Sequence, residues 1–246
     1  MHSILEVNKD TDKTKVFGFY YAGGNVNAFL PWVKKESSIA FIPVELPGHG
    51  RRRKEPLPTD IKTVALEAAR AIADLVEDEE FAIWGHSMGA AVAFEAAAYL
   101  EKYYGLQPVV LIVSARQAPG SDFKGLYHCN QGKDALVDDL KRLGMMPDAL
   151  LEAKDFMDYA IPIIYNDYLI NEEYECGKDK LNIPIVANYG QGDVEATRDV
   201  LLEWQKVTEA GFEIKKFSGD HFYIFEPDTG YFRNLELTVQ QFLHSA

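Results

Sequence analysis

Cysteine, long apolar runs and positive charge are all scarce in this chain of 246 residues. The two cysteines, Cys129 and Cys176, suggest neither a disulfide framework nor a metal-binding motif. The chain has no run of about 18 apolar residues, the length needed to cross a bilayer. Residues 1–10 lack the basic start and apolar stretch of a signal peptide. We therefore expect a cytoplasmic protein with no metal ion and no membrane contact.

The charge balance is acidic, with 25 Lys and Arg against 38 Asp and Glu and a formal net charge of −13. Nucleic acids and anionic membranes are bound through clustered basic side chains, so neither is expected as a partner. Hydrophobic residues make up 47% of the chain, which is ordinary for a folded globular protein. A chain of this length can bury its apolar residues in one core. We expect a single domain over residues 1–246, and a monomer.

Strand-like and helix-like patterns alternate along the sequence. Strands are predicted at residues 15–20, 39–44, 81–84, 109–113, 183–189 and 212–217. Helices are predicted at residues 61–76, 88–100 and 231–243. This alternation predicts an α/β fold with a mainly parallel central sheet and helices on both faces.

One stretch, about residues 116–181, breaks the alternation because it contains no strand pattern. Its helical patterns cover residues 133–143, 149–159 and 163–172. Helices inserted between two core strands predict a lid. Six apolar residues of this lid are candidates to line an acyl channel, with packing in the core of the lid as the alternative: Leu140, Leu143, Met145, Met146, Leu150 and Phe156.

The segment Gly85-His86-Ser87-Met88-Gly89 is the most informative part of the sequence. This Gly-x-Ser-x-Gly pattern directly follows a predicted strand and directly precedes a predicted helix, which is the context of a nucleophile elbow. The glycines permit a sharp turn, so Ser87 would project above the sheet as the nucleophile. The alternative is a serine on an ordinary Gly-rich turn.

A serine hydroxyl needs a base, and His221 is the best placed of six histidines. It follows the strand at 212–217 in a loop at the carboxyl edge of the sheet, where ligands bind in open α/β folds. His86 adjoins Ser87, but neighbours on a sharp turn point apart, so we expect it to support the turn. His49 lies in a Pro-Gly-x-Gly turn, and His128 lies in the lid.

The acid that orients the base is predicted to be Asp193, which follows the strand at 183–189 beside two glycines. A helix-capping role is its alternative. Glu195 and Asp199 compete but are expected to enter the next helix, and Asp122 follows the preceding strand. Serine, then acid, then histidine is also the chain order of α/β-hydrolases.

Two backbone N–H groups are predicted to stabilise an oxyanion. One belongs to Met88, at the positive end of the helix after Ser87. The other belongs to Ala22 in the loop Tyr21-Ala22-Gly23-Gly24, with Gly23 as the alternative.

Taken together, the chain resembles the type II thioesterases of nonribosomal peptide and polyketide assembly lines over nearly its whole length. The motifs that carry the resemblance are Tyr21–Gly24, Leu46-Pro47-Gly48-His49-Gly50-Arg51, Gly85–Gly89, Leu143-Gly144-Met145-Met146-Pro147, Gly190-Gln191-Gly192-Asp193 and Gly219-Asp220-His221-Phe222-Tyr223. The resemblance implies an α/β-hydrolase that clears wrong acyl groups from the phosphopantetheine arm of acyl or peptidyl carrier protein domains. It implies no cofactor beyond that arm. Tyr20 stands where the family usually has Pro, which leaves the acyl preference open.

In this resemblance, Ser87, Asp193 and His221 fall on the catalytic triad positions of the family. Ala22 and Met88 fall on its oxyanion positions. The run Arg51-Arg52-Arg53-Lys54 is a hypothetical docking site for the acidic carrier, with a solvated basic turn as the alternative. Rival functions are a product-releasing or medium-chain acyl thioesterase, a carboxylesterase with the same triad, and a non-catalytic binding protein of this fold.

Overall fold

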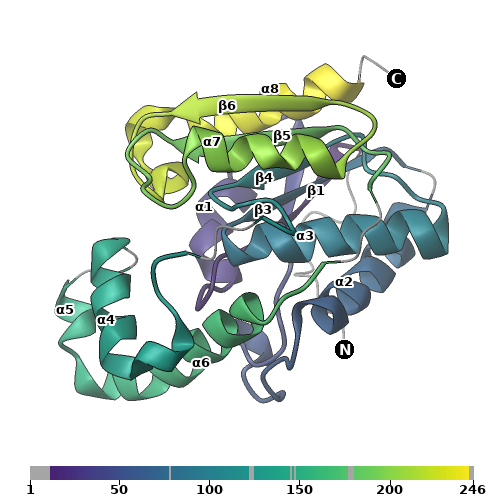
Figure 1. Cartoon of the computed structure of the whole chain (residues 1–246). Coiled ribbons are helices and arrows are strands. Elements are labelled where there is room, and N and C mark those ends of the chain that lie inside the picture. Colours follow the sequence, from purple (N-terminus) through teal and green to yellow (C-terminus); the bar gives the residue numbers. More distant parts are fainter. Residues whose placement is uncertain are drawn as a thin grey trace.

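A six-stranded parallel sheet forms the centre of the molecule (Figure 1). The computed structural model describes residues 12–243 except 78, 122–124, 145, 147 and 177–179. The strands are β1 (Thr14–Phe19), β2 (Ile39–Pro43), β3 (Phe81–His86), β4 (Leu111–Ser114), β5 (Ile185–Gly190) and β6 (Phe212–Phe217). They are ordered β2-β1-β3-β4-β5-β6, and every neighbouring pair is parallel. The predicted parallel α/β sheet is confirmed.

Helices cover both faces of this sheet (Figure 1). Three of them are long: α2 (Ile61–Val76), α3 (Met88–Tyr99) and α8 (Tyr231–Leu243). Two are short: α1 (Leu30–Val33) and α7 (Arg198–Leu201). Helices α2 and α3 pack together on one face, and α1 and α8 lie on the other. On that second face the ring of Trp32 in α1 lies 5.3 Å from Trp84 of β3 and 5.4 Å from Phe232 of α8.

Short 3-10 and π turns connect these elements. The 3-10 turns are Val26–Phe29, Gly50–Arg52, Cys129–Gln131, Leu202–Val207, Tyr223–Phe225 and Pro227–Thr229, and a π turn covers Leu100–Tyr104. No pattern in the sequence predicts α1, because a helix of four residues is too short to show a helical period. The helix expected after Asp193 is α7, which contains Asp199 but not Glu195. Among the described residues, no helix has both the length and the apolar character needed to span a membrane.

Three helices are inserted between β4 and β5, where the lid was expected (Figure 1). They are α4 (Gly132–Arg142), α5 (Asp148–Leu151) and α6 (Lys154–Glu172). They enclose a second, small core, formed by Leu136, Leu140, Ala160, Ile161 and Ile164.

The prediction of separate helices at 149–159 and 163–172 is wrong, because α6 is continuous and contains Pro162. A proline inside a helix removes one backbone hydrogen bond and usually breaks the helix. Here Ile161 and Ile164, on either side of it, are both buried in the small core. Burial of these side chains therefore holds together a helix that the local sequence disfavours.

Candidate active site

Ser87 occupies a strained turn between β3 and α3. Its φ and ψ are 55° and −124°, so this residue lies in a region that side chains other than glycine rarely adopt. Its N–H donates to the carbonyl of Ser114 at 2.8 Å. A Cβ at Gly85 would lie 2.2 Å from the carbonyl oxygen of Gly89, and one at Gly89 would lie 2.2 Å from that of Phe19. The two glycines of the motif are therefore required by the close approach of backbone to backbone.

His221 and Asp193 come together at the carboxyl edge of the sheet. Nδ1 of His221 lies 2.8 Å from Oδ2 of Asp193, and both side chains are buried. Oδ1 of Asp193 accepts the N–H groups of Glu195 and Ala196 at 2.9 and 3.0 Å. The carboxylate thus both orients the imidazole and caps the turn that follows β5. The two roles considered for Asp193 from the sequence are compatible, since each uses a different oxygen.

Asp193 is held in its charged form by this environment. Burial alone would raise the pKa of its carboxyl, but the hydrogen bond and charge of His221, together with the two backbone N–H groups, lower the pKa to about 2. A carboxylate only accepts hydrogen bonds, so the proton of the contact belongs to Nδ1 of His221. Nε2 of His221 is then the nitrogen with a free lone pair, as a general base requires.

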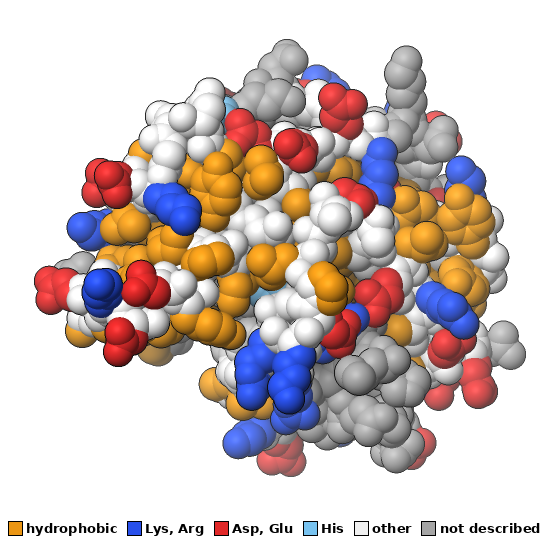
Figure 2. Space-filling view, turned by 90° about the horizontal axis from the view of Figure 1, so that it is seen from below, with side chains coloured by type: hydrophobic (Ala, Val, Ile, Leu, Met, Phe, Trp, Pro, Cys, Tyr) orange, Lys and Arg blue, Asp and Glu red, His pale blue; other side chains and the backbone are white. Residues whose placement is uncertain are grey.

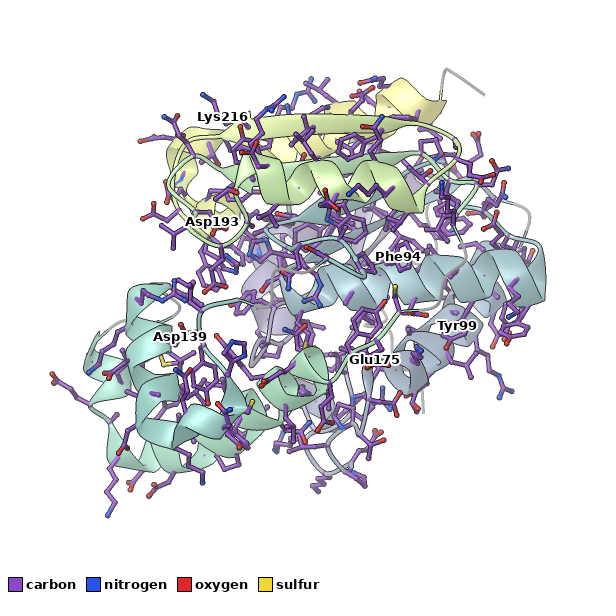
Figure 3. The ribbon with its side chains drawn as sticks, viewed as in Figure 1. Phe94, Tyr99, Asp139, Glu175, Asp193 and Lys216 are labelled. Carbon is purple, nitrogen blue, oxygen red and sulfur yellow. The ribbon has the colours of Figure 1, made fainter. Side chains whose placement is uncertain are left out.

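Ser87 and His221 line the same cavity, of about 120 Å³. The cavity lies between the edge of the sheet and the inserted helices, and Figure 3 shows Asp193 at that edge and Asp139 on α4 below it. The structure has no direct hydrogen bond between the side chains of Ser87 and His221, both of which it describes. Such contacts are often long in a free enzyme and tighten when substrate binds.

The predicted oxyanion donors line this cavity as well. Ala22 and Met88 both face it, and within the described part of the chain neither N–H donates to another group. Met88 is the first residue of α3, where the N–H has no partner within the helix. The alternative donor, the N–H of Gly23, is occupied because it donates to Oδ2 of Asp167 at 2.7 Å. The geometry therefore favours Ala22.

Asp167 and His49 form a contact that the sequence analysis missed. Nε2 of His49 lies 2.9 Å from Oδ2 of Asp167, and both side chains are buried. Burial would lower the pKa of His49, but hydrogen bonding and charge from Asp167 raise it overall. Because Asp167 lies on α6, it connects the inserted helices to the turn that carries His49 and, through Gly23, to the loop that carries Ala22. Asp167 and Gly23 are 144 residues apart in the sequence, so no local pattern could have indicated their contact.

His86 supports the turn, as expected, rather than facing the nucleophile. Its Nδ1 lies 2.9 Å from Oγ of Ser114, which in turn lies 2.6 Å from the hydroxyl of Tyr223. Burial, with a smaller contribution from the nearby His221, holds the pKa of His86 well below its usual range. The neutral imidazole ties the end of β3 to β4 and to the loop after His221.

The competing acids do not reach His221. Glu195 lies in the turn after β5 instead of the next helix, and it pairs with Arg142 of α4. Asp199 lies in the first turn of α7, as expected, with its side chain 92% exposed. Asp122 lies outside the described residues.

The lining of the cavity differs from the apolar channel expected in the lid. Of the five predicted residues that the structure describes, only Leu143 lines it. Leu140 and Met146 pack in the small core of the insertion, whereas Leu150 and Phe156 are 39% and 36% exposed. Met145 lies outside the described residues. Polar residues face the cavity instead, among them Arg116, Gln117 and Asn171.

Residues 14–236 match the model of the thioesterase domain family. The chain belongs to the thioesterase family. This thioesterase is 32% identical over 235 residues to LgrE of Brevibacillus parabrevis, named linear gramicidin dehydrogenase, with 93% of this chain and 88% of LgrE covered. It is 30% identical over 225 residues to the medium-chain S-acyl fatty acid synthase thioesterase of Rattus norvegicus, with 87% and 82% of the two chains covered.

The thioesterase also resembles solved structures. It is 26% identical to YbtT, the type II thioesterase from the Yersiniabactin NRPS/PKS biosynthetic pathway, with a TM-score of 0.86 and 98% of each chain covered. The α/β-hydrolase fold and the likeness to type II thioesterases expected from the motifs are both confirmed. The order of the strands, the elbow and the position of the helical insertion are thus features of a thioesterase.

Proposed function

We propose that this thioesterase hydrolyses acyl thioesters with Ser87 as nucleophile, His221 as base and Asp193 as the acid that orients it. The observation that carries the proposal is the 2.8 Å contact of Asp193 with Nδ1 of His221, in a cavity that Ser87 also lines. This contact leaves Nε2 free to accept a proton inside that cavity.

The reaction proceeds in two acyl transfers. Nε2 of His221 takes the proton of Ser87 as Oγ attacks the thioester carbonyl, and the carbon–sulfur bond then breaks. The leaving thiolate takes that proton and departs as a thiol, leaving an ester on Ser87. A water molecule then gives a proton to His221 and attacks the ester, and His221 returns the proton to Ser87 as the carboxylic acid leaves.

Charge on the carbonyl oxygen is stabilised by the N–H groups of Ala22 and Met88. Donors that are already fixed and unpaired before substrate arrives need no rearrangement as the oxyanion forms. Two features fix them here: Met88 begins α3, and the neighbour of Ala22, Gly23, is held by Asp167.

The proposed substrate is an acyl group on the phosphopantetheine arm of an acyl or peptidyl carrier protein domain, and the proposed task is to regenerate misacylated carriers. Support comes from the likeness to YbtT, a type II thioesterase of an NRPS/PKS pathway.

The proposed docking site for the carrier is the basic turn at residues 51–54. Arg51, Arg53 and Lys54 are exposed. Arg52 is not available for docking, since it is buried and paired with Glu55 and Glu67. Figure 2 shows a group of Lys and Arg side chains on this lower side of the molecule, near a band of hydrophobic side chains. These three exposed cations would suit an acidic partner even though the whole chain is acidic.

The test is turnover of acyl-pantetheine thioesters by wild type and by Ser87→Ala. We expect the variant to remain folded and to lose about 10³-fold or more in kcat. A fluorophosphonate probe should label wild type on Ser87 and leave the variant unlabelled. Wild-type turnover by Ser87→Ala would overturn the assignment, and absence of labelling would favour a non-catalytic binding protein.

The second candidate is a medium-chain acyl thioesterase or carboxylesterase with the same triad. It is favoured by the 30% identity to the rat medium-chain enzyme. Comparison of short and medium-chain acyl groups, each as a carrier-bound thioester and as a simple oxygen ester, separates the candidates. Preference for medium chains or oxygen esters would favour this second function.

A further inference from the structure

A row of buried polar side chains crosses the sheet close to the elbow. His86 at the end of β3 pairs in register with Ser114 at the end of β4, and Ser114 pairs with Asn188 of β5. All three side chains are buried. Residues in register on neighbouring strands share a face of the sheet, and so does Trp84, which precedes His86 by two positions. Four polar side chains are therefore gathered on one face at the carboxyl end of the strands.

The hydroxyl of Tyr231, the first residue of α8, meets two of these side chains. It accepts the indole N–H of Trp84 at 2.7 Å and the side-chain N–H of Asn188 at 3.0 Å. Its own proton is directed to the remaining neighbours, because Tyr231 also forms hydrogen bonds with Ser114 and Tyr223. The phenol oxygen has both of its acceptor positions filled, so towards these neighbours it can only donate.

Tyr223 brings the loop of His221 to the same place. It follows His221 by two residues, and its hydroxyl lies 2.6 Å from Oγ of Ser114. The same Oγ lies 2.9 Å from Nδ1 of His86. Ser114, Tyr223 and Tyr231 therefore form one buried hydroxyl network, which ends at the imidazole of His86.

The directions of the hydrogen bonds in this hydroxyl network follow from the number of protons. Among the described residues, Tyr223 contacts the oxygens of Ser114 and Tyr231, and the latter accepts no further bond. Tyr223 therefore donates to Ser114. Each hydroxyl has a single proton, so that of Ser114 is left for Nδ1 of His86. Every hydroxyl proton then has one acceptor.

The network thus sets the tautomer of His86. Because Nδ1 accepts from Ser114, the imidazole is neutral and its proton lies on Nε2. That nitrogen is buried and has no hydrogen-bond partner in the described part of the chain. His221 has the opposite arrangement, since its Nδ1 proton is held by Asp193. Two neighbouring histidines are therefore fixed in different tautomers by different partners.

The ring of His86 is one of two that hold the proposed base in place. Its centre lies 5.3 Å from the centre of the His221 ring, and Phe222 lies 5.1 Å from that ring. A base must become a cation during the reaction, and a second cation beside it would oppose that charge. The bond from Ser114 occupies the lone pair of His86 and so prevents this.

On the basis of the proposed function, we propose that the hydroxyl network positions the catalytic base: it fixes His86 as a neutral imidazole with its proton on Nε2, and it holds the loop of His221 against that ring. Tyr223 makes the second connection, because it belongs to that loop and bonds to the end of β4. The network acts through His221 and does not touch the reacting atoms.

The first test is the tautomer of His86 in the wild-type protein labelled with 15N-histidine. The protonated and bare nitrogens of a neutral imidazole have different 15N shifts, and the signals are assigned from His86→Gln and His221→Gln. At mildly alkaline pH we expect His86 to be protonated on Nε2 and His221 on Nδ1. In Ser114→Ala, His86 should lose this preference. Protonation of His86 on Nδ1 in wild type would overturn the inference.

The second test is the turnover of an acyl-pantetheine thioester by Tyr223→Phe. We expect kcat to fall about 5- to 10-fold, the factor for one buried hydrogen bond, with little change in KM. Tyr165→Phe is the matched control, because it removes a hydroxyl that donates to the carbonyl of Cys129 in the insertion. Equal kcat in Tyr223→Phe and in this control would contradict a positioning role.

A double variant shows whether the hydroxyls act together. In Ser114→Ala the hydroxyl of Tyr223 has already lost its partner, so addition of Tyr223→Phe should cause no further loss of kcat. Losses that multiply would overturn the inference, because they would mean that the two hydroxyls act independently.

These outcomes are distinct from those that test Ser87. The tautomer of His86 is measured without substrate, so it decides the inference even if a variant fails to fold or no thioester is turned over. Conversely, if His86 has the other tautomer while turnover still depends on Ser87, the proposed function stands and only the role of the network is lost.

Discussion

Asp167 on α6 accepts the N–H of Gly23 at 2.7 Å, across 144 residues of sequence. A helix of the insertion therefore holds the loop that carries Ala22, the proposed oxyanion donor. His49 completes the contact from a third segment, with its Nε2 2.9 Å from the same oxygen. The inserted helices thus form part of the proposed catalytic machinery in addition to covering it.

Replacing Asp167 with asparagine should impair catalysis more than substrate binding. The amide offers a weaker acceptor to Gly23 and His49, so the loop loses its fixed position and the oxyanion its prepared donor. We expect kcat to fall about 10-fold or more, with a much smaller change in KM. Steady-state kinetics on an acyl-pantetheine thioester measures both.

Asn166→Ala is the control for Asp167. It removes the contact of the same helix with the carbonyl of Pro58 and leaves Gly23 held. An equal loss of kcat in the two variants would mean that loosening α6 by either route impairs catalysis, and the hydrogen bond of Asp167 to Gly23 would then have no special role.

Asp193→Asn should reduce kcat by about 10⁴-fold, which is the loss expected when the imidazole of a serine triad is held in the wrong tautomer. The amide can donate to Nδ1 of His221, which would then place the proton on Nε2. Near-normal turnover by this variant would show that the carboxylate does not serve His221. Fluorophosphonate labelling of Ser87 should slow in parallel.

Asp193 also makes stability depend on pH. Its folded pKa of about 2 lies below the ordinary value of 3.8, so it stabilises the fold above pH 4, and this contribution is lost as pH falls toward 2. The difference corresponds to about 2 kcal/mol. Urea unfolding of wild type and Asp193→Asn from pH 7 to pH 2 measures it. Parallel curves for the two proteins would contradict the expectation.

Gly89→Ala should destabilise the fold by about 1–3 kcal/mol or more, because the new Cβ would lie 2.2 Å from the carbonyl oxygen of Phe19. Gly211→Ala is the matched control. Its Cβ would meet nothing within 4 Å, and we expect a change within about 0.5 kcal/mol. Melting temperatures decide this, and similar values for the two variants would show that the elbow tolerates a side chain.

Charge reversal at the basic turn tests carrier docking. Arg51→Glu with Arg53→Glu should lower kcat/KM about 10-fold for a carrier-bound thioester, mainly through KM, and leave free acyl-pantetheine nearly unchanged. Lys34→Glu with Lys206→Glu makes the same change of charge at exposed positions outside the turn. If both double variants lose the same factor in kcat/KM for the carrier-bound thioester, the net charge of the protein, and not the basic turn, controls binding of the carrier.

Much of the fold could be predicted because its signals are local. Each strand of the sheet was found within two residues of its observed bounds, since buried parallel strands are short, continuous apolar runs. The short helix α1 was not predicted, α7 was expected only as a helix of unstated bounds after Asp193, and α6 was divided at Pro162. In α6, contacts with α4 outweigh the local preference of proline.

The sequence by itself determined the elbow at Ser87, because its glycines, strand and helix are neighbours in the chain. It also indicated His221 and Asp193, which each follow a strand and so reach one edge of a parallel sheet. Only the tertiary structure brought Asp167 to Gly23 and packed Leu140 and Met146 in the core of the insertion instead of the cavity lining. The contact of Asp167 with Gly23 joins residues 144 positions apart, and such contacts are settled by packing and burial, which no short stretch of sequence records.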